Sequence, residues 1–146
     1  MPYKFNPFTG NLDVVNDAAD DILLHITDES AFLALGVAYT IKKWPRQHTV
    51  TGLPLWMLNT PAKGTSAQFD IRINGTSIFA TLPTVDANED GSDTAATPAV
   101  FSAAFIAGGQ VIPRYASVTF HVLQVGSDAL HPGGGAKVSI PVTGAG

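Results

Sequence analysis

The sequence predicts an all-β fold, an antiparallel two-sheet β-sandwich of seven or eight strands that follows an extended N-terminal arm. Charged residues make up only 14% of the 146-residue chain, against about 25% in typical domains, so few residues suit the exposed faces of helices. Fourteen glycines and ten prolines supply turns. Between them lie short runs of alternating apolar and polar residues, and several such runs at close spacing favour a sandwich.

The length suits one domain, which we place at residues 31–146, with residues 1–30 as the arm. The arm lacks helical or strand periodicity over most of its length and carries six acidic residues against one lysine. Its aromatic side chains are too sparse to bury one another, so they need a surface on the domain or on another chain. Within the arm we expect a short β-like run at 22–26 and, after Asp28 as N-cap, one helical turn over 29–33.

The first strand of the domain is predicted over residues 37–44, which alternate and end at Pro45. A second run, 49–59, is interrupted by glycine and proline, as suits an edge or bulged strand. The clearest hairpin covers residues 69–82, because Asn74-Gly75 supplies the two positive-φ residues of a type I′ turn.

A polar loop over residues 86–97 precedes a strand or mixed segment at 99–107, and a short run follows before Pro113. Residues 117–125 alternate cleanly and place Val118, Phe120 and Val122 on one face. A glycine-rich loop leads to a last strand over 137–142.

Composition excludes several classes of function. The net charge is −4 and no cluster of Lys or Arg forms a basic stripe, so we predict no nucleic-acid partner. No apolar run reaches the roughly 18 residues of a membrane span, and the first residues lack the apolar core of a signal peptide. The absence of cysteine removes disulfides and thiolate metal sites.

No catalytic residues or cofactors are predicted. The sequence has no Gly-x-Ser-x-Gly elbow, and the glycine-rich segment before Lys137 leads into a strand rather than the helix of a phosphate loop. The four histidines lack metal-ligand spacing. Asp86, Asn88 and Asp90 match the first half of a calcium loop, but position 12 is Thr97 instead of a bidentate Glu. We therefore predict no metal site and keep these three residues as a weak Ca²⁺ candidate.

Aromatic residues offer a sugar-stacking platform as one interpretation. Trp44, Trp56 and Tyr115, with Tyr39 beside them, would present flat apolar faces to a glycan. The alternative interpretation is that the tryptophans fill the core of the sandwich.

Several separated motifs occur in the order found in one family of virion modules: FNPFTGNLD at 5–13, DIRINGTSIF at 70–79, DANE at 86–89, ATPAV at 96–100, QVGS at 124–127 and a Gly-rich segment before Lys137-Val138. Together they cover the N-terminus and residues 35–142. In this pattern the chain resembles the β-sandwich modules of tailed-phage virion proteins, including those of cyanobacterial viruses, which recur in tail fibres, tailspikes and capsid decoration (cement) proteins.

The resemblance implies a non-enzymatic virion structural protein that is made in the host cytoplasm and placed on the outer capsid surface, with the major capsid protein as partner. It also implies a homotrimer. From the low surface charge we expect strand edges, or the apolar run at 101–106, near the trimer axis. The arm would attach the protein to the capsid through Tyr3, Phe5 and Phe8. The alternative is a tail fibre or tail accessory module that binds host surface carbohydrate.

Overall fold

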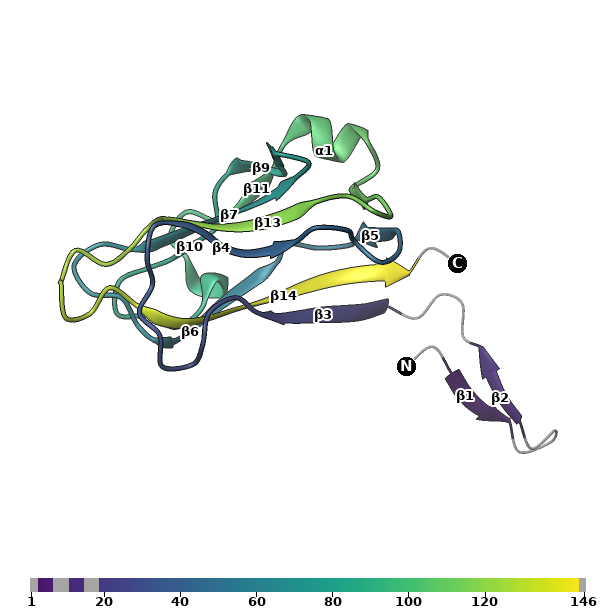
Figure 1. Ribbon diagram of the computed structural model, residues 1–146, viewed down its shortest axis with the longest axis horizontal. Helices are drawn as coiled ribbons and strands as arrows, with labels where there is room; N and C mark the ends of the chain where they lie inside the picture. Colours follow the sequence, from purple (N-terminus) through teal and green to yellow (C-terminus); the bar gives the residue numbers. More distant parts are fainter. Residues whose placement is uncertain (1–2, 7–10, 15–18, 145–146) are drawn as a thin grey trace.

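The computed structural model describes residues 3–6, 11–14 and 19–144, with side chains for residues 21–143. Two antiparallel five-stranded sheets form a β-sandwich, which confirms the predicted fold class (Figure 1). The strands are shorter and more numerous than the seven or eight predicted, because turns and bulges divide several of the alternating runs.

The first sheet has the strand order β10-β7-β13-β4, and β8 lies beside β7. Val118, Phe120 and Val122 on β13 are each 0% exposed, so the predicted inward face is confirmed. Strand β13 lies between β7 and β4, and β4 forms one edge of the sheet. The strands are β4 (Gly36–Ile41), β7 (Ala67–Ile73), β8 (Thr76–Ser77), β10 (Thr84–Val85) and β13 (Val118–Gln124).

The second sheet has the order β12-β5-β14-β3, and β6 also pairs with β14. The run predicted at 49–59 is indeed interrupted, and both of its halves pair with β14. Its first half, β5, lies between β12 and β14 and is therefore not an edge. The strands are β3 (Ala19–His25), β5 (His48–Val50), β6 (Leu55–Thr60), β12 (Val111–Ile112) and β14 (Gly134–Gly144).

Strand β14 begins inside the glycine-rich segment, which its composition predicts to be a loop. A Cβ on Gly134 would lie 2.7 Å from the carbonyl oxygen of Ala31, and one on Gly135 would lie 2.7 Å from that of Glu29. These glycines therefore let the strand pass against the backbone of the segment between β3 and β4.

The N-terminal region is more regular than the predicted extended arm. Strands β1 (Tyr3–Asn6) and β2 (Asn11–Val14) form an antiparallel hairpin. Strand β3 pairs with β14 over its whole length, so the second sheet includes residues that the sequence placed in the arm. The predicted helical turn over 29–33 is formed only at its start, where the N–H of Ala31 donates to the carbonyl of Asp28 at 3.0 Å; no helix follows, because Phe32 bridges to Gly134.

The Asn74-Gly75 turn is confirmed, with φ angles of 50° and 85°. Its second strand, however, leaves the sheet after Ser77, whose Oγ accepts the N–H of Phe79 at 3.1 Å. Strand β9 (Phe79–Thr81) then pairs with β11 (Val100–Phe101) outside the two main sheets. The segment predicted at 99–107 as strand or mixed is mixed, since helix α1 (Ala103–Ala107) follows β11. One further 3-10 turn, η1, covers Ser92–Thr94.

The core joins the two sheets through aromatic packing. Trp56 on β6 is 0% exposed and stacks on Phe69 of β7, with ring centroids 4.2 Å apart and an angle of 6° between the planes. Its ring also meets Phe120 of β13 edge-on at 6.4 Å. Because β6 and β7 belong to opposite sheets, this cluster holds the layers together.

Candidate functional site

The sugar-stacking platform is not formed by the two tryptophans. Trp44 and Trp56 are 2% and 0% exposed, so neither ring presents a face to solvent, and the core interpretation is the correct one for both. The indole N–H of Trp44 donates to Nδ1 of His48 at 2.8 Å. Trp56 Nε1 has no hydrogen-bond partner among the described residues.

Tyr115 is the exposed member of the predicted set, with 61% of its surface accessible. The guanidinium of Arg114 lies 4.6 Å from the centre of its ring. Tyr39 is 39% exposed, but its ring lies 6.0 Å from that of Phe120 at the sheet edge. The sugar-binding interpretation therefore depends on Tyr115 rather than on a group of rings.

The weak calcium candidate forms a hydrogen-bonded loop. A carboxylate oxygen of Asp86 accepts the N–H of Ala96 at 2.8 Å, and the backbone carbonyl of Asp90 accepts the N–H of Leu58 at 2.8 Å. Asn88 adopts a left-handed conformation with φ 68°. No group of three or more His, Cys, Asp or Glu side chains within the described part of the chain is placed to hold a metal ion.

The histidines are dispersed, and each has its own neighbour. His25 lies 3.8 Å from Glu29, and His131 lies 3.2 Å from Asp128. Hydrogen bonds from the backbone N–H of Leu130 and from His131 lower the pKa of Asp128. His48 receives the Trp44 indole, as described above.

A polar cluster lies on the outer face of the first sheet, around Asp70, a carboxylate that is 1% exposed. The Asp70 carboxylate accepts hydrogen bonds from Nε of Arg72 at 2.9 Å and from Oγ of Ser77 at 2.6 Å. His121 lies opposite Asp70 on the neighbouring strand β13, but the hydrogen-bond partner of its Nε2 is Oγ1 of Thr119, at 2.8 Å. Burial and the positive charge of Arg72 lower the pKa of His121, while Asp70 raises it to a smaller extent. The hydrogen bonds of Asp70 stabilise the β7–β8 hairpin. They do not form a Ser–His–Asp triad, because the histidine is bonded to Thr119.

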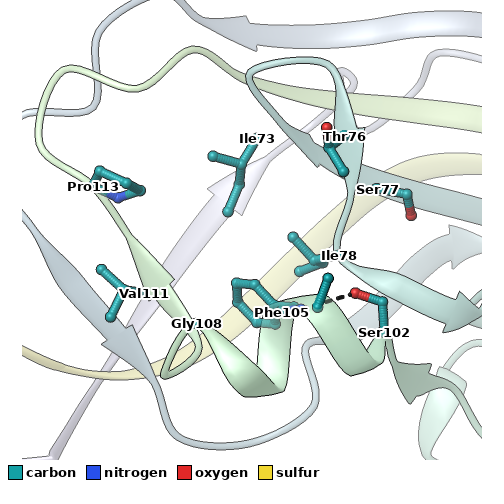
Figure 2. A pocket seen from close by; sticks show the side chains of 10 residues that line it. Ile73, Thr76, Ser77, Ile78, Ser102, Phe105, Gly108, Val111 and Pro113 are labelled. Atoms are coloured by element: carbon teal, nitrogen blue, oxygen red, sulfur yellow. Dashed lines mark hydrogen bonds between the residues drawn. The ribbon is translucent and has the colours of Figure 1, made fainter.

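An apolar pocket of about 240 Å³ lies between the β7–β8 hairpin, α1 and β12. Figure 2 shows the side chains of Ile73, Ile78 and Val111 around the ring of Phe105. Ser102 caps α1 by accepting the N–H of Phe105 at 3.1 Å, and the Ser77 hydroxyl bonds Asp70. An apolar cavity of about 150 Å³ binds benzene, so this pocket has room for one aromatic or aliphatic group. Its lining contains no titratable side chain.

A second hollow, of about 470 Å³, has a different character. It is lined largely by hydroxyl, amide and carboxylate side chains, which suit a polyhydroxylated ligand. The polar members are Ser66, Gln68, Thr81, Thr84, Asp86 and Thr97.

Strand β4 forms an exposed apolar edge of the first sheet. Val37 is 56% exposed, and Leu35, just before the strand, is 67% exposed. Leu123 on the adjacent β13 is 38% exposed. Alternation over residues 37–44 predicts a strand there but does not indicate that the strand lies at a sheet edge.

The predicted anchors lie at the N-terminus. Tyr3 and Phe5 belong to β1, whose backbone pairs with β2. Phe8 lies outside the described residues.

Comparison with known proteins finds no matching family model, no similar curated protein and no similar solved structure. The described residues include no helix with the length and apolar character of a membrane-spanning segment.

Proposed function

We propose that this protein is a non-enzymatic structural component of a phage virion, a homotrimeric capsid decoration protein that reinforces the outer capsid surface. The observation that carries the proposal is the division of the chain into a sandwich and a separate N-terminal hairpin. Strands β1 and β2 pair with each other and belong to neither main sheet. A compact domain that carries a separate aromatic segment suits a protein that binds a preassembled surface.

The hairpin supplies the chemistry of attachment. Tyr3 and Phe5 are large apolar residues on β1, and Phe8 follows in the sequence. Each aromatic side chain buries about 150–200 Å² in an interface, which contributes a few kcal/mol before the cost of ordering. The major capsid protein is the proposed partner.

Deletion of residues 2–12 tests this role. The truncated protein should keep its melting temperature, because the paired strands of both sheets begin at Ala19, and it should lose occupancy on capsids that lack the protein. Phe5→Ala with Phe8→Ala should weaken binding in the same direction, and Phe5→Leu serves as the conservative control. Full occupancy by the truncated protein would show that the sandwich alone holds the capsid. A lowered melting temperature with full occupancy would show that the hairpin covers its own domain.

A tail fibre or tail accessory module that binds host carbohydrate is the second candidate. The polar hollow beside β10 favours it, because hydroxyl, amide and carboxylate groups pair with sugar hydroxyls. Copy number separates the candidates: hundreds of copies per particle indicate decoration, and a few to a few tens indicate a tail. Absence from purified particles would remove both.

A further inference from the structure

We infer that copies of this chain associate through the β4 edge, defined here as residues 36–41 with the adjacent Leu35 and Leu123. The inference rests on the homotrimer of the proposed function and names the surface that forms it. Three properties carry it: a free row of backbone groups, exposed apolar side chains and the absence of charge.

The backbone of β4 pairs with β13 on one side and ends the sheet on the other. An unpaired strand edge attracts a further strand or chain, and proteins that remain monomeric protect such edges with charges or proline. The segment Gly36–Ile41 contains neither, and the nearest charged residues, Lys42 and Lys43, follow its end. Strand β3, the edge of the second sheet, differs from β4 because it carries the polar residues Asp21 and His25. Beside β3, Lys137 Nζ forms an ion pair with Glu29 Oε1 at 2.7 Å.

The side chains extend the apolar surface beyond the backbone. Val37 pairs with His121, which alternates with the buried Phe120 and Val122, so Val37 lies on the outer face of the sheet. Leu35 precedes Gly36 and Leu123 follows Val122, and Gly36 and Val122 are the last paired residues of β4 and β13, so both leucines lie at the same end of this strand pair. Exposures of 38–67% for Val37, Leu35 and Leu123 leave much apolar surface to bury at this end of the β4 edge.

The apolar run at 101–106, the other surface expected at the trimer axis, is largely used inside the molecule. Phe101 stacks on Phe79 at 5.8 Å and lies 5.2 Å from Phe105. Ile106 is the large side chain of this run that stays mostly exposed, at 53%. One isolated side chain does not make an interface core, so the β4 edge is the better surface.

A second copy of the chain is the occupant that this surface fits. Each copy carries a net charge of −4, so identical copies repel one another except where they meet at an uncharged surface. A strongly charged partner would need opposite charges, which the β4 edge does not provide. Direct pairing of two β4 backbones would join only two copies, so in a trimer the three edges meet through their exposed apolar side chains.

The test compares Leu35→Lys/Val37→Lys with Ile106→Lys, a matched control that places one lysine on an exposed apolar residue outside the edge. Light scattering at micromolar concentration should give three times the 15.3 kDa chain mass for the wild type and the control, and the single-chain mass for the double variant. Circular dichroism should show the same folded spectrum for all three, because the substituted side chains are already exposed.

An unchanged trimer in the double variant would overturn the inference, as would a wild type that remains a single chain at about 100 μM. A two-chain wild type that the double variant splits would support the β4 edge and remove only the trimer from the proposed function. Absence of the protein from purified virions would count against the proposed function and leave the surface intact. The two proposals therefore fail separately.

Discussion

The two tryptophans have nearly equal burial and different hydrogen bonding, so replacing each with Phe isolates the effect of one buried N–H group. Trp44 is 2% exposed and donates to His48, whereas Trp56 is 0% exposed and its Nε1 has no partner within the described part of the chain. Phe keeps an aromatic ring in both places and removes the donor.

The smaller ring should cost about 1–2 kcal/mol of unfolding free energy at either position. Trp44→Phe also removes the 2.8 Å hydrogen bond, which adds about 1–2 kcal/mol. Trp56→Phe removes an unsatisfied buried donor and recovers about 1–3 kcal/mol. The retained Phe ring still stacks on Phe69. We therefore expect Trp44→Phe to be the less stable variant by about 3 kcal/mol, with a melting temperature lower by roughly 5–10 °C.

Urea denaturation measures the difference, with the remaining tryptophan as the fluorescence probe and far-UV circular dichroism as the second probe. Equal m-values would show that both variants expose the same surface on unfolding. An equal or larger loss of stability in Trp56→Phe would refute the reasoning, because it would mean that Nε1 is satisfied in solution.

Three further predictions concern other contacts. Gly126→Ala should lower the free energy of unfolding, measured by thermal denaturation, by more than about 3 kcal/mol, because the new Cβ would lie 2.8 Å and 2.9 Å from backbone atoms of Lys63. In the control Gly75→Ala, the new Cβ would have no atom within 4 Å, so the loss should be only about 1 kcal/mol, owing to the positive φ of Gly75. Asp70→Ala should lower the free energy of unfolding, measured by urea denaturation, by about 3 kcal/mol, because Arg72 loses the carboxylate to which it donates. Ser77→Ala removes a single hydrogen bond to Asp70 and should lower it by about 1 kcal/mol. The pKa of His121 is lowered below 6.5 in the folded state, so the folded state binds fewer protons than the unfolded state. The free energy of unfolding should therefore fall as the pH drops below 6.5. The same pH series on His121→Gln should show a smaller fall.

Local patterns predicted the parts of the fold that depend on neighbouring residues. Asn74-Gly75 specifies its turn because both residues accept positive φ, and alternation along β13 specifies which side chains face inward. The early end of β8 was not predictable in this way. It depends on Ser77, which bonds both Asp70 and the N–H of Phe79, and this contact exists only after β7 and β8 have paired.

Glycine and acidic residues caused the larger errors at the ends of the chain. Gly134 and Gly135 resemble a loop in sequence, but they lie in β14 because the backbone of Ala31 and Glu29 passes too close for a Cβ. Strand β3 includes Asp20 and Asp21 and therefore resembled a solvated segment. Its pairing with β14 joins residues more than a hundred positions apart, which local periodicity does not register.

The same dependence on distant pairing explains why the exposed surfaces were harder to predict than the strands. Trp44 and Trp56 look in sequence like candidates for a binding surface, and Val37 looks like an ordinary member of an alternating strand. Whether a residue is buried depends on which strands flank its own, and that order is set by contacts far apart in the chain. Strand β6 faces β7 across the core, so Trp56 is enclosed, whereas β4 has a neighbour on one side only, so Val37 stays 56% exposed. Strand order thus converts two similar apolar patterns into a core residue in one strand and an exposed residue at a sheet edge in the other.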